Sequence, residues 1–225
     1  MKIKTLNQIL VIALTAGAGL LLAGCKTSGY QQADKTGEGI ASFRAEILNG
    51  KKAIDETMAS LDAVAPSAAS DPRAAFEKYS KSVANLESTA AKIRKRGDQM
   101  REQGKAYFAQ WEQQLAQVKN PEIQQLATQR KQKLQEAFDN IKNVAEPLKT
   151  QFDPWMSDLK DLQTYLANDL TITGIDAAKP LFTKAQDGGR QVQKSMDNLI
   201  AELNSIAATI TAAKVPPQPV PEKKS

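Results

Sequence analysis

The architecture follows from residues 71–121, which read DPRAAFEKYSKSVANLESTAAKIRKRGDQMREQGKAYFAQWEQQLAQVKNP. Apolar and small residues recur there in steps of three and four: Phe76, Tyr79, Val83, Leu86, Ala90, Ile93, Gly97, Met100, Gly104, Tyr107, Trp111, Leu115 and Val118. Those steps keep one stripe of an α-helix apolar. At about 1.5 Å per residue, this helix would be roughly 70 Å long. Asp71-Pro72 and Asn120-Pro121 supply cap and turn residues at its two ends.

The same period appears before this stretch. Ile40, Ile47, Ile54 and Leu61 recur every seven residues. The spacing predicts a helix of about 25 residues with one apolar stripe. It should end near Pro66, because proline interrupts helical hydrogen bonding.

Three further helical segments are predicted after the long helix. The first carries the period over residues 123–148 and should kink or end at Pro147. The second restarts at a predicted Asp153-Pro154 cap and breaks at residues 171–174, and the last carries the period over residues 182–210. Short turns between long helices favour antiparallel neighbours. The predicted fold is therefore all-α, an elongated antiparallel up-and-down helical bundle with coiled-coil-like packing.

Four glycines lie on the apolar stripes: Gly50, Gly97, Gly104 and Gly189. Glycine costs a helix interior about 1 kcal/mol relative to alanine, so these positions need a reason. If the turns act as hairpins, Phe138 lies level with Gly104, and Trp155 lies level with Gly189. We predict that each glycine makes room for a bulky side chain across the bundle. Glycines acting as hinges for a change of shape are the alternative.

The amino terminus predicts export and lipid attachment. Met1 to Lys4 is a short basic segment, followed by an apolar run over residues 9–22. This run is shorter than the about 20 residues that a membrane-spanning helix needs. It ends in Leu22-Ala23-Gly24-Cys25, which resembles the bacterial lipobox. We expect residues 1–24 to be a lipoprotein signal peptide and Cys25 to be lipidated. A cleaved signal that happens to end near a cysteine is the alternative.

Four regions follow from these patterns. After the signal peptide, residues 25–38 are predicted to be a lipidated flexible tether, 39–214 the helical bundle domain and 215–225 a proline-rich disordered tail. Lys26 follows Cys25 where some lipoproteins have aspartate. By resemblance to lipoprotein sorting in two-membrane bacteria, this implies the periplasmic face of the outer membrane. A host with one membrane would remove that inference.

Composition excludes much catalytic chemistry. The 225 residues contain no histidine and one cysteine, Cys25, which excludes His/Cys zinc sites, internal disulfides and imidazole triads. Ser157-Asp-Leu-Lys160 and Lys35-Thr36-Gly37 match motifs of penicillin-recognising enzymes, but in reversed order and with no predicted sheet, so we attribute both to chance. The net charge of +5 is too small to predict nucleic acid binding. We expect no enzyme activity, no cofactor, no metal site and no nucleic acid partner.

One charged feature is a candidate site for an anionic partner. Its cations are Lys92, Arg94, Lys95, Arg96, Arg101 and Lys105 on the long helix, and Arg130 on the predicted neighbour, which could lie at a similar height. Acidic residues three or four positions away favour a salt-bridged surface instead. The sharper interpretation is a site for anionic wall polymer, lipid headgroups or an acidic protein. Arg130 also falls on the apolar period, so it either snorkels or meets a carboxylate.

Three short segments resemble a known family: Tyr107-Phe108-x-x-Trp111-Glu112-x-x-Leu115, Asn120-Pro121-Glu122-Ile123 and Tyr165-Leu166-x-x-Asp169-Leu170. They are similar to uncharacterised bacterial lipoproteins grouped as domain of unknown function 2959. The resemblance spans about residues 70–210, and the chain departs from the family's pattern near the mature N-terminus. It implies a helical protein of the bacterial envelope and offers no catalytic residues to transfer.

These patterns predict a membrane-anchored periplasmic lipoprotein that acts as a non-catalytic scaffold or adaptor for another envelope protein or polymer. The alternative is a binding module whose basic helical face docks on an anionic envelope polymer or lipid headgroups. Binding by that module would fall steeply with salt. An enzyme would need a buried cluster of carboxylates or lysines with shifted pKa values. The oligomeric state stays open, because a residual apolar stripe would drive either self-association or internal packing.

Overall fold

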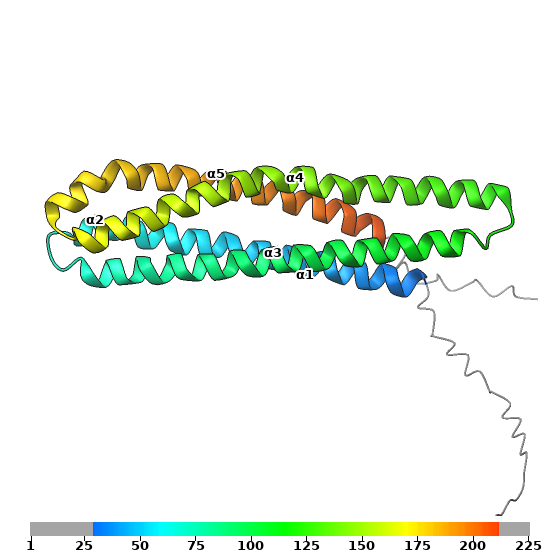
Figure 1. Cartoon of the computed structure of the whole chain (residues 1–225), viewed down its shortest axis with the longest axis horizontal. Coiled ribbons are helices and arrows are strands. Elements are labelled where there is room, and N and C mark those ends of the chain that lie inside the picture. The colour runs from blue at the N-terminus through cyan, green and yellow to red at the C-terminus, as the bar shows by residue number, and fades with distance from the viewer. Residues whose placement is uncertain (1–28, 212–225) are drawn as a thin grey trace, which may run out of the picture.

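The computed structural model describes residues 29–211, which are helical except for short turns (Figure 1). The long helices are α1 (Gly29–Asp62), α3 (Arg73–Leu115), α4 (Pro121–Asn168) and α5 (Ile172–Thr211), and α2 (Val64–Ser67) is a single turn. No strand occurs between residues 29 and 211. The all-α prediction is confirmed.

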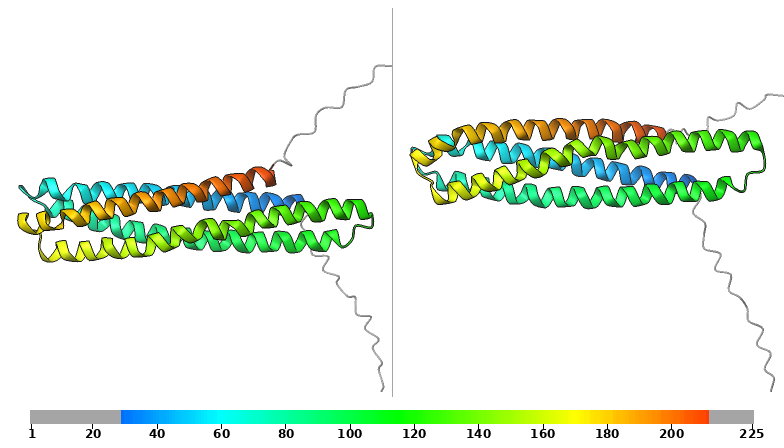
Figure 2. Two further views of the ribbon diagram at one scale, coloured as in Figure 1. Left: turned by 90° about the horizontal axis from the view of Figure 1, so that it is seen from above. Right: turned by 45° about the horizontal axis from the view of Figure 1, so that its top comes forward.

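The long helices form an elongated antiparallel bundle (Figures 1 and 2). Helix α1 packs against α3 and α5, and α4 packs against the same two helices from the other side. The α1–α3 interface is the most extensive and the α3–α4 interface the least. We call the end where α1 begins and α5 ends the terminal end, and the end with α2 and the α4–α5 turn the distal end.

The core contains the apolar stripes that the sequence predicts. Ile54, Leu86, Leu159 and Leu203, one from each long helix, are at most 1% exposed. Burial of such side chains stabilises the fold by about 1.5–3 kcal/mol each. The bundle is therefore held together along its axis by contacts between helices.

Two predicted helix starts are confirmed by their hydrogen bonds. A carboxylate oxygen of Asp71 accepts from the backbone N–H of Arg73 at 3.1 Å. The side-chain oxygen of Asn120 accepts from the N–H groups of Glu122 and Ile123, at 2.9 Å and 3.2 Å. Both contacts satisfy backbone donors that a helix start leaves unpaired.

Helix α4 corrects one prediction. Pro147 was expected to kink or end the helix, and it does not end it; the restart expected at Asp153-Pro154 is wrong, because α4 is one helix of 48 residues that contains both prolines. Each proline removes a backbone hydrogen bond and costs on the order of 3 kcal/mol. Burial of neighbouring side chains, including Trp155 and Leu159, offsets that cost. Figure 1 shows α4 changing direction near its middle.

The start of α1 corrects a second prediction. The tether expected over residues 25–38 is too long, because α1 begins at Gly29. Thr36 is fully buried, and its hydroxyl donates to the carbonyl of Gln32 at 2.8 Å. Packing on the end of α3 stabilises this glycine-containing segment as a helix, although its propensity is poor. The signal peptide, Cys25 and the tail at 215–225 lie outside the described residues.

The glycine prediction is confirmed. Each predicted glycine faces a bulky side chain of another helix: Gly50 faces Ile93, Gly97 faces Phe43, Gly104 faces Phe138 and Gly189 faces Trp155. Gly188, which the sequence pattern did not single out, also lies against the Trp155 ring. The indole N–H of Trp155 donates to the carbonyl of Ala185 at 2.8 Å, so this ring is held in place.

Candidate functional site

Large apolar side chains are exposed mainly at the two ends of the bundle. Among residues 29–211 these are Tyr30, Leu48, Ile123, Leu126, Tyr165, Ile172 and Leu181. Tyr30, Ile123 and Leu126 belong to the first turns of α1 and α4, at the terminal end (Figure 1). The last three lie near the α4–α5 turn, at the distal end, and only Leu48 lies midway. The large exposed apolar side chains therefore concentrate toward the two ends of the bundle.

At the terminal end, α3 and α4 extend past the other two helices. Gly29, the first residue of α1, lies against Gln114 of α3. Near the same level, Lys131 of α4 pairs with Glu112 of α3, with Nζ and Oε2 3.3 Å apart. The nine residues 121–129 of α4 therefore project about 14 Å beyond the start of α1, at 1.5 Å per residue.

Among the described residues, neither α1 nor α5 extends alongside the first turns of α4. We call residues 115–130 the hairpin tip. Ile123 is 52% exposed and Leu126 69% exposed, although both continue the apolar period of α4. Arg130 contacts the end of α5, since it donates to the carbonyl of Thr209 at 3.2 Å. Helix α5 ends two residues later, at Thr211, so its described part does not extend alongside Ile123 and Leu126.

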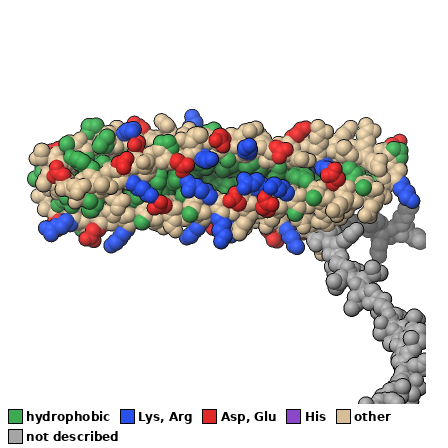
Figure 3. Space-filling view, viewed as in Figure 1, with side chains coloured by type: hydrophobic (Ala, Val, Ile, Leu, Met, Phe, Trp, Pro, Cys, Tyr) green, Lys and Arg blue, Asp and Glu red, His purple; other side chains and the backbone are tan. Residues whose placement is uncertain are grey.

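Three cations of the basic run are paired within the chain. Arg94 reaches across to α4, where its Nη2 lies 2.6 Å from a carboxylate oxygen of Asp153. Arg101 pairs with Asp98 at 2.6 Å, and Lys105 pairs with Glu102 at 2.8 Å. The hydrogen bond and the charge of Lys105 hold the pKa of Glu102 below its ordinary value. Figure 3 accordingly shows basic and acidic side chains intermixed along this face, with apolar side chains between them.

The other cations of the run are placed apart from these pairs. Lys92 lines a hollow between α3 and α1, with Glu46 and Glu56 of α1. Arg96 donates to the side-chain oxygen of Gln99 at 3.1 Å, and Lys95 is exposed. The run is therefore divided between the side of α3 that faces α4 and the side that faces α1.

Arg130 lies toward the terminal end of the run, close enough to Tyr107 of α3 for its charge to act on that side chain. Its neighbour Lys131 pairs with Glu112, which follows Lys105 by two turns of α3. Arg130 is exposed and meets the backbone carbonyl of Thr209 in place of a carboxylate. The candidate residues thus form a dispersed set of cations.

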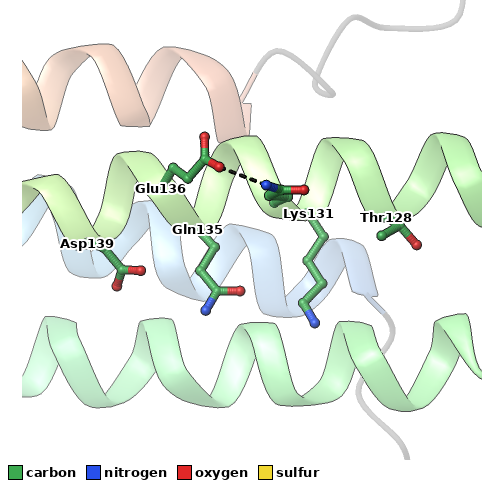
Figure 4. A pocket seen from close by; sticks show the side chains of 6 residues that line it. Thr128, Lys131, Gln135, Glu136 and Asp139 are labelled. Atoms are coloured by element: carbon green, nitrogen blue, oxygen red, sulfur yellow. Dashed lines mark hydrogen bonds between the residues drawn. The ribbon is translucent and has the colours of Figure 1, made fainter.

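Two hollows on the described surface are lined mainly by polar and charged residues. One, of about 350 Å³, lies along α4 and is lined by Thr128, Lys131, Gln132, Gln135, Glu136 and Asp139 (Figure 4). Gln132 donates to Glu136 at 2.9 Å within it. The other, of about 240 Å³, is the α1–α3 hollow that contains Lys92. Both open to the surface.

The titratable groups with raised pKa values are core tyrosines. Burial raises the pKa of Tyr79 and of Tyr107. The Tyr79 hydroxyl donates to the carbonyl of Leu159 at 2.8 Å, which is a structural contact. Lys160, from the Ser-x-x-Lys match, pairs with Glu87 at 2.5 Å. Within residues 29–211 no cluster of three or more acidic, histidine or cysteine side chains could hold a metal ion.

No helix between residues 29 and 211 is both long enough and apolar enough to cross a membrane.

The exposed ends could not be found from the sequence period. Ile123 and Leu126 occupy the same stripe as the buried Leu134 and Ile141. Whether a stripe position is buried depends on how far the neighbouring helices overlap it. The only hint was a difference in length, since the period starts at Ile40 in the first helix and ends at Ile210 in the last.

Comparison with known proteins identifies a family that covers most of the chain. A family model described as "Protein of unknown function (DUF2959)" matches residues 25–210. The match begins at Cys25, in the region where the resemblance predicted a departure from the family's pattern. No curated protein and no solved structure matches the chain significantly.

Proposed function

Because the chain belongs to the DUF2959 family of proteins of unknown function, we propose its function from its own residues. It is a lipid-anchored, non-catalytic adaptor of the bacterial envelope. Residues 1–24 direct export, and Cys25 carries the fatty acyl chains, several of which make an anchor effectively permanent. Lys26 favours the periplasmic face of the outer membrane.

One observation carries this proposal: the large exposed apolar side chains of the described residues lie mainly toward the two ends of the rod. The predicted lipid site lies four residues before Gly29, at the terminal end. Helix α4 alone, with 48 residues, has a length of about 72 Å. A rod held by one end presents its other end far from the membrane, as a spacer or adaptor requires.

The distal end supplies the surface for a protein partner. Ile172 is 58% exposed, Leu181 50% and Tyr165 37%. The hydroxyl of Tyr165 donates to the carbonyl of Gly174 at 3.1 Å, so the ring is held before any partner arrives. Preorganised aromatic and aliphatic side chains are typical anchors of protein interfaces.

The basic run supports the alternative function less well. Binding to an anionic polymer or lipid headgroups needs unpaired positive charge on one face. Arg94, Arg101 and Lys105 instead form ion pairs within the chain, and Lys92 lies on another side of α3. A steep loss of polymer binding with added salt would favour the alternative over the adaptor.

Two measurements test the proposal. The intact mass of the mature protein should correspond to a chain beginning at Cys25 with added diacylglycerol and acyl groups. A photo-crosslinking residue at Ile172 should then give a discrete product in intact cells. Leu48, 44% exposed and midway along the rod, is the matched control and should give none. A mature chain without lipid, or equal crosslinking at both positions, would overturn the proposal.

A further inference from the structure

We infer that the hairpin tip, residues 115–130, rests on the phospholipid surface that holds the anchor, so that the bundle stands end-on. This inference rests on the proposed lipidation of Cys25. It adds a second, non-covalent membrane contact made by folded residues. It also fixes the angle between the rod and the membrane, which a lipid anchor alone does not fix.

The first argument is distance. Three residues separate Cys25 from Gly29, and the four Cα–Cα steps between them span at most about 14 Å when fully extended. The lipid-bearing residue therefore stays close to the terminal end. The hairpin tip projects by about the same 14 Å beyond Gly29, from nine helical residues at 1.5 Å each. If residues 25–29 extend along the axis of the rod, the membrane surface lies at the level of the hairpin tip.

The second argument is the chemistry of the hairpin tip. Ile123 and Leu126 are exposed side by side on one face of α4, one turn apart. The exposed cations Lys119 and Arg130 flank them, and Glu122 is the only acid within residues 115–130. A membrane surface with anionic headgroups binds protein segments in which apolar side chains lie beside cations.

The third argument is effective concentration. Two apolar side chains alone bind a membrane weakly. A short tether converts their binding into an intramolecular step at about millimolar effective concentration or higher. The hairpin tip should therefore contact lipid in the anchored protein and not in a chain without its lipid.

The test uses the mature lipoprotein in vesicles of phosphatidylethanolamine and phosphatidylglycerol. Cys25 is the only cysteine and its thiol is consumed by lipidation, so one introduced cysteine gives a single labelling site. Gln125→Cys places an environment-sensitive fluorophore at the hairpin tip, and Ala69→Cys places it at the distal end; both positions are exposed. Lipids with a nitroxide near the headgroup should quench the label at 125 strongly and the label at 69 only at background.

A matched variant separates apolar contact from mere proximity. Ile123→Gln with Leu126→Gln should reduce quenching at 125 toward the value at 69. Because both side chains are largely exposed, helicity and flotation with the vesicles should stay unchanged. The Cys25→Ser protein should lose flotation.

The outcomes distinguish the two proposals. Failure of the wild-type protein to float overturns the lipid anchor and, with it, the contact. Flotation without quenching at 125 overturns the hairpin-tip contact alone and leaves the anchor standing. If the label at 125 is already shielded from water without vesicles, another segment of the chain or a second copy covers the hairpin tip, and the lipid contact is overturned. Loss of that shielding on removal of residues 212–225 identifies the tail, and its loss on dilution identifies a second copy.

Discussion

The close approach of Gly188 to Trp155 predicts that Gly188→Ala destabilises the bundle. A Cβ at this position would collide with Cδ1 of the indole ring. It would also lie 3.1 Å from Nε1 and 3.2 Å from Cγ of the same ring. Trp155 is 4% exposed and held by its hydrogen bond to Ala185, so the ring cannot move away freely. Overpacking of this kind costs about 1–3 kcal/mol.

Two further effects nearly cancel. Loss of the indole hydrogen bond costs about 1 kcal/mol. Alanine gains about 1 kcal/mol over glycine inside a helix. The net expectation is a loss of about 1–3 kcal/mol, which lowers the thermal midpoint by about 2–4 °C per kcal/mol in a chain of this size.

The assay is urea unfolding of the Cys25→Ser protein, followed by far-ultraviolet circular dichroism. In a Trp155→Leu background the collision is gone, so Gly188→Ala should stabilise by up to about 1 kcal/mol. Gly104→Ala is the control, because Phe138 is only partly buried and its ring can shift. A Gly188→Ala protein as stable as wild type with Trp155 intact would show that the glycine does not make room for the ring.

Three other outcomes are expected. Tyr79→Phe should cost about 1 kcal/mol at neutral pH through loss of its hydrogen bond. Burial raises the pKa of Tyr79, so its contribution is complete below the unfolded tyrosine pKa of about 10 and is lost as pH rises further; unfolding midpoints between pH 9 and 11 should therefore fall more steeply for wild type than for the variant. Asn120→Ala should cost about 1 kcal/mol and speed amide exchange in the first turn of α4, whereas Asn120→Ser should restore protection. Arg94→Gln should change stability by less than about 1 kcal/mol, because the ion pair with Asp153 is exposed; a larger loss in urea unfolding would assign that pair a structural role.

The helices and their contacts were largely predictable. The period of three and four residues in α3 identified its buried face, and the caps at Asp71 and Asn120 located two helix starts. The match of Gly104 with Phe138 followed from hairpin geometry alone. Each of these rests on spacing within one helix or across one turn, which the order of residues specifies directly.

Continuity and overlap were not predictable in the same way. Pro147 is a helix breaker by local chemistry, yet α4 continues through it because tertiary burial outweighs the lost hydrogen bond. The glycine-containing segment from Gly29 is helical because α3 covers it, and the candidate cations are divided because Arg94 reaches α4 while Lys92 faces α1.

Local spacing thus specified which residues form helices and which face of each helix is apolar. It could not specify where neighbouring helices stop, because that depends on packing energies summed across the whole bundle. Ile123 and Leu134 share one stripe, yet one is half exposed and the other buried. The difference lies in the helices beside them, and it is this difference that creates the apolar hairpin tip at the end of the bundle where α1 begins.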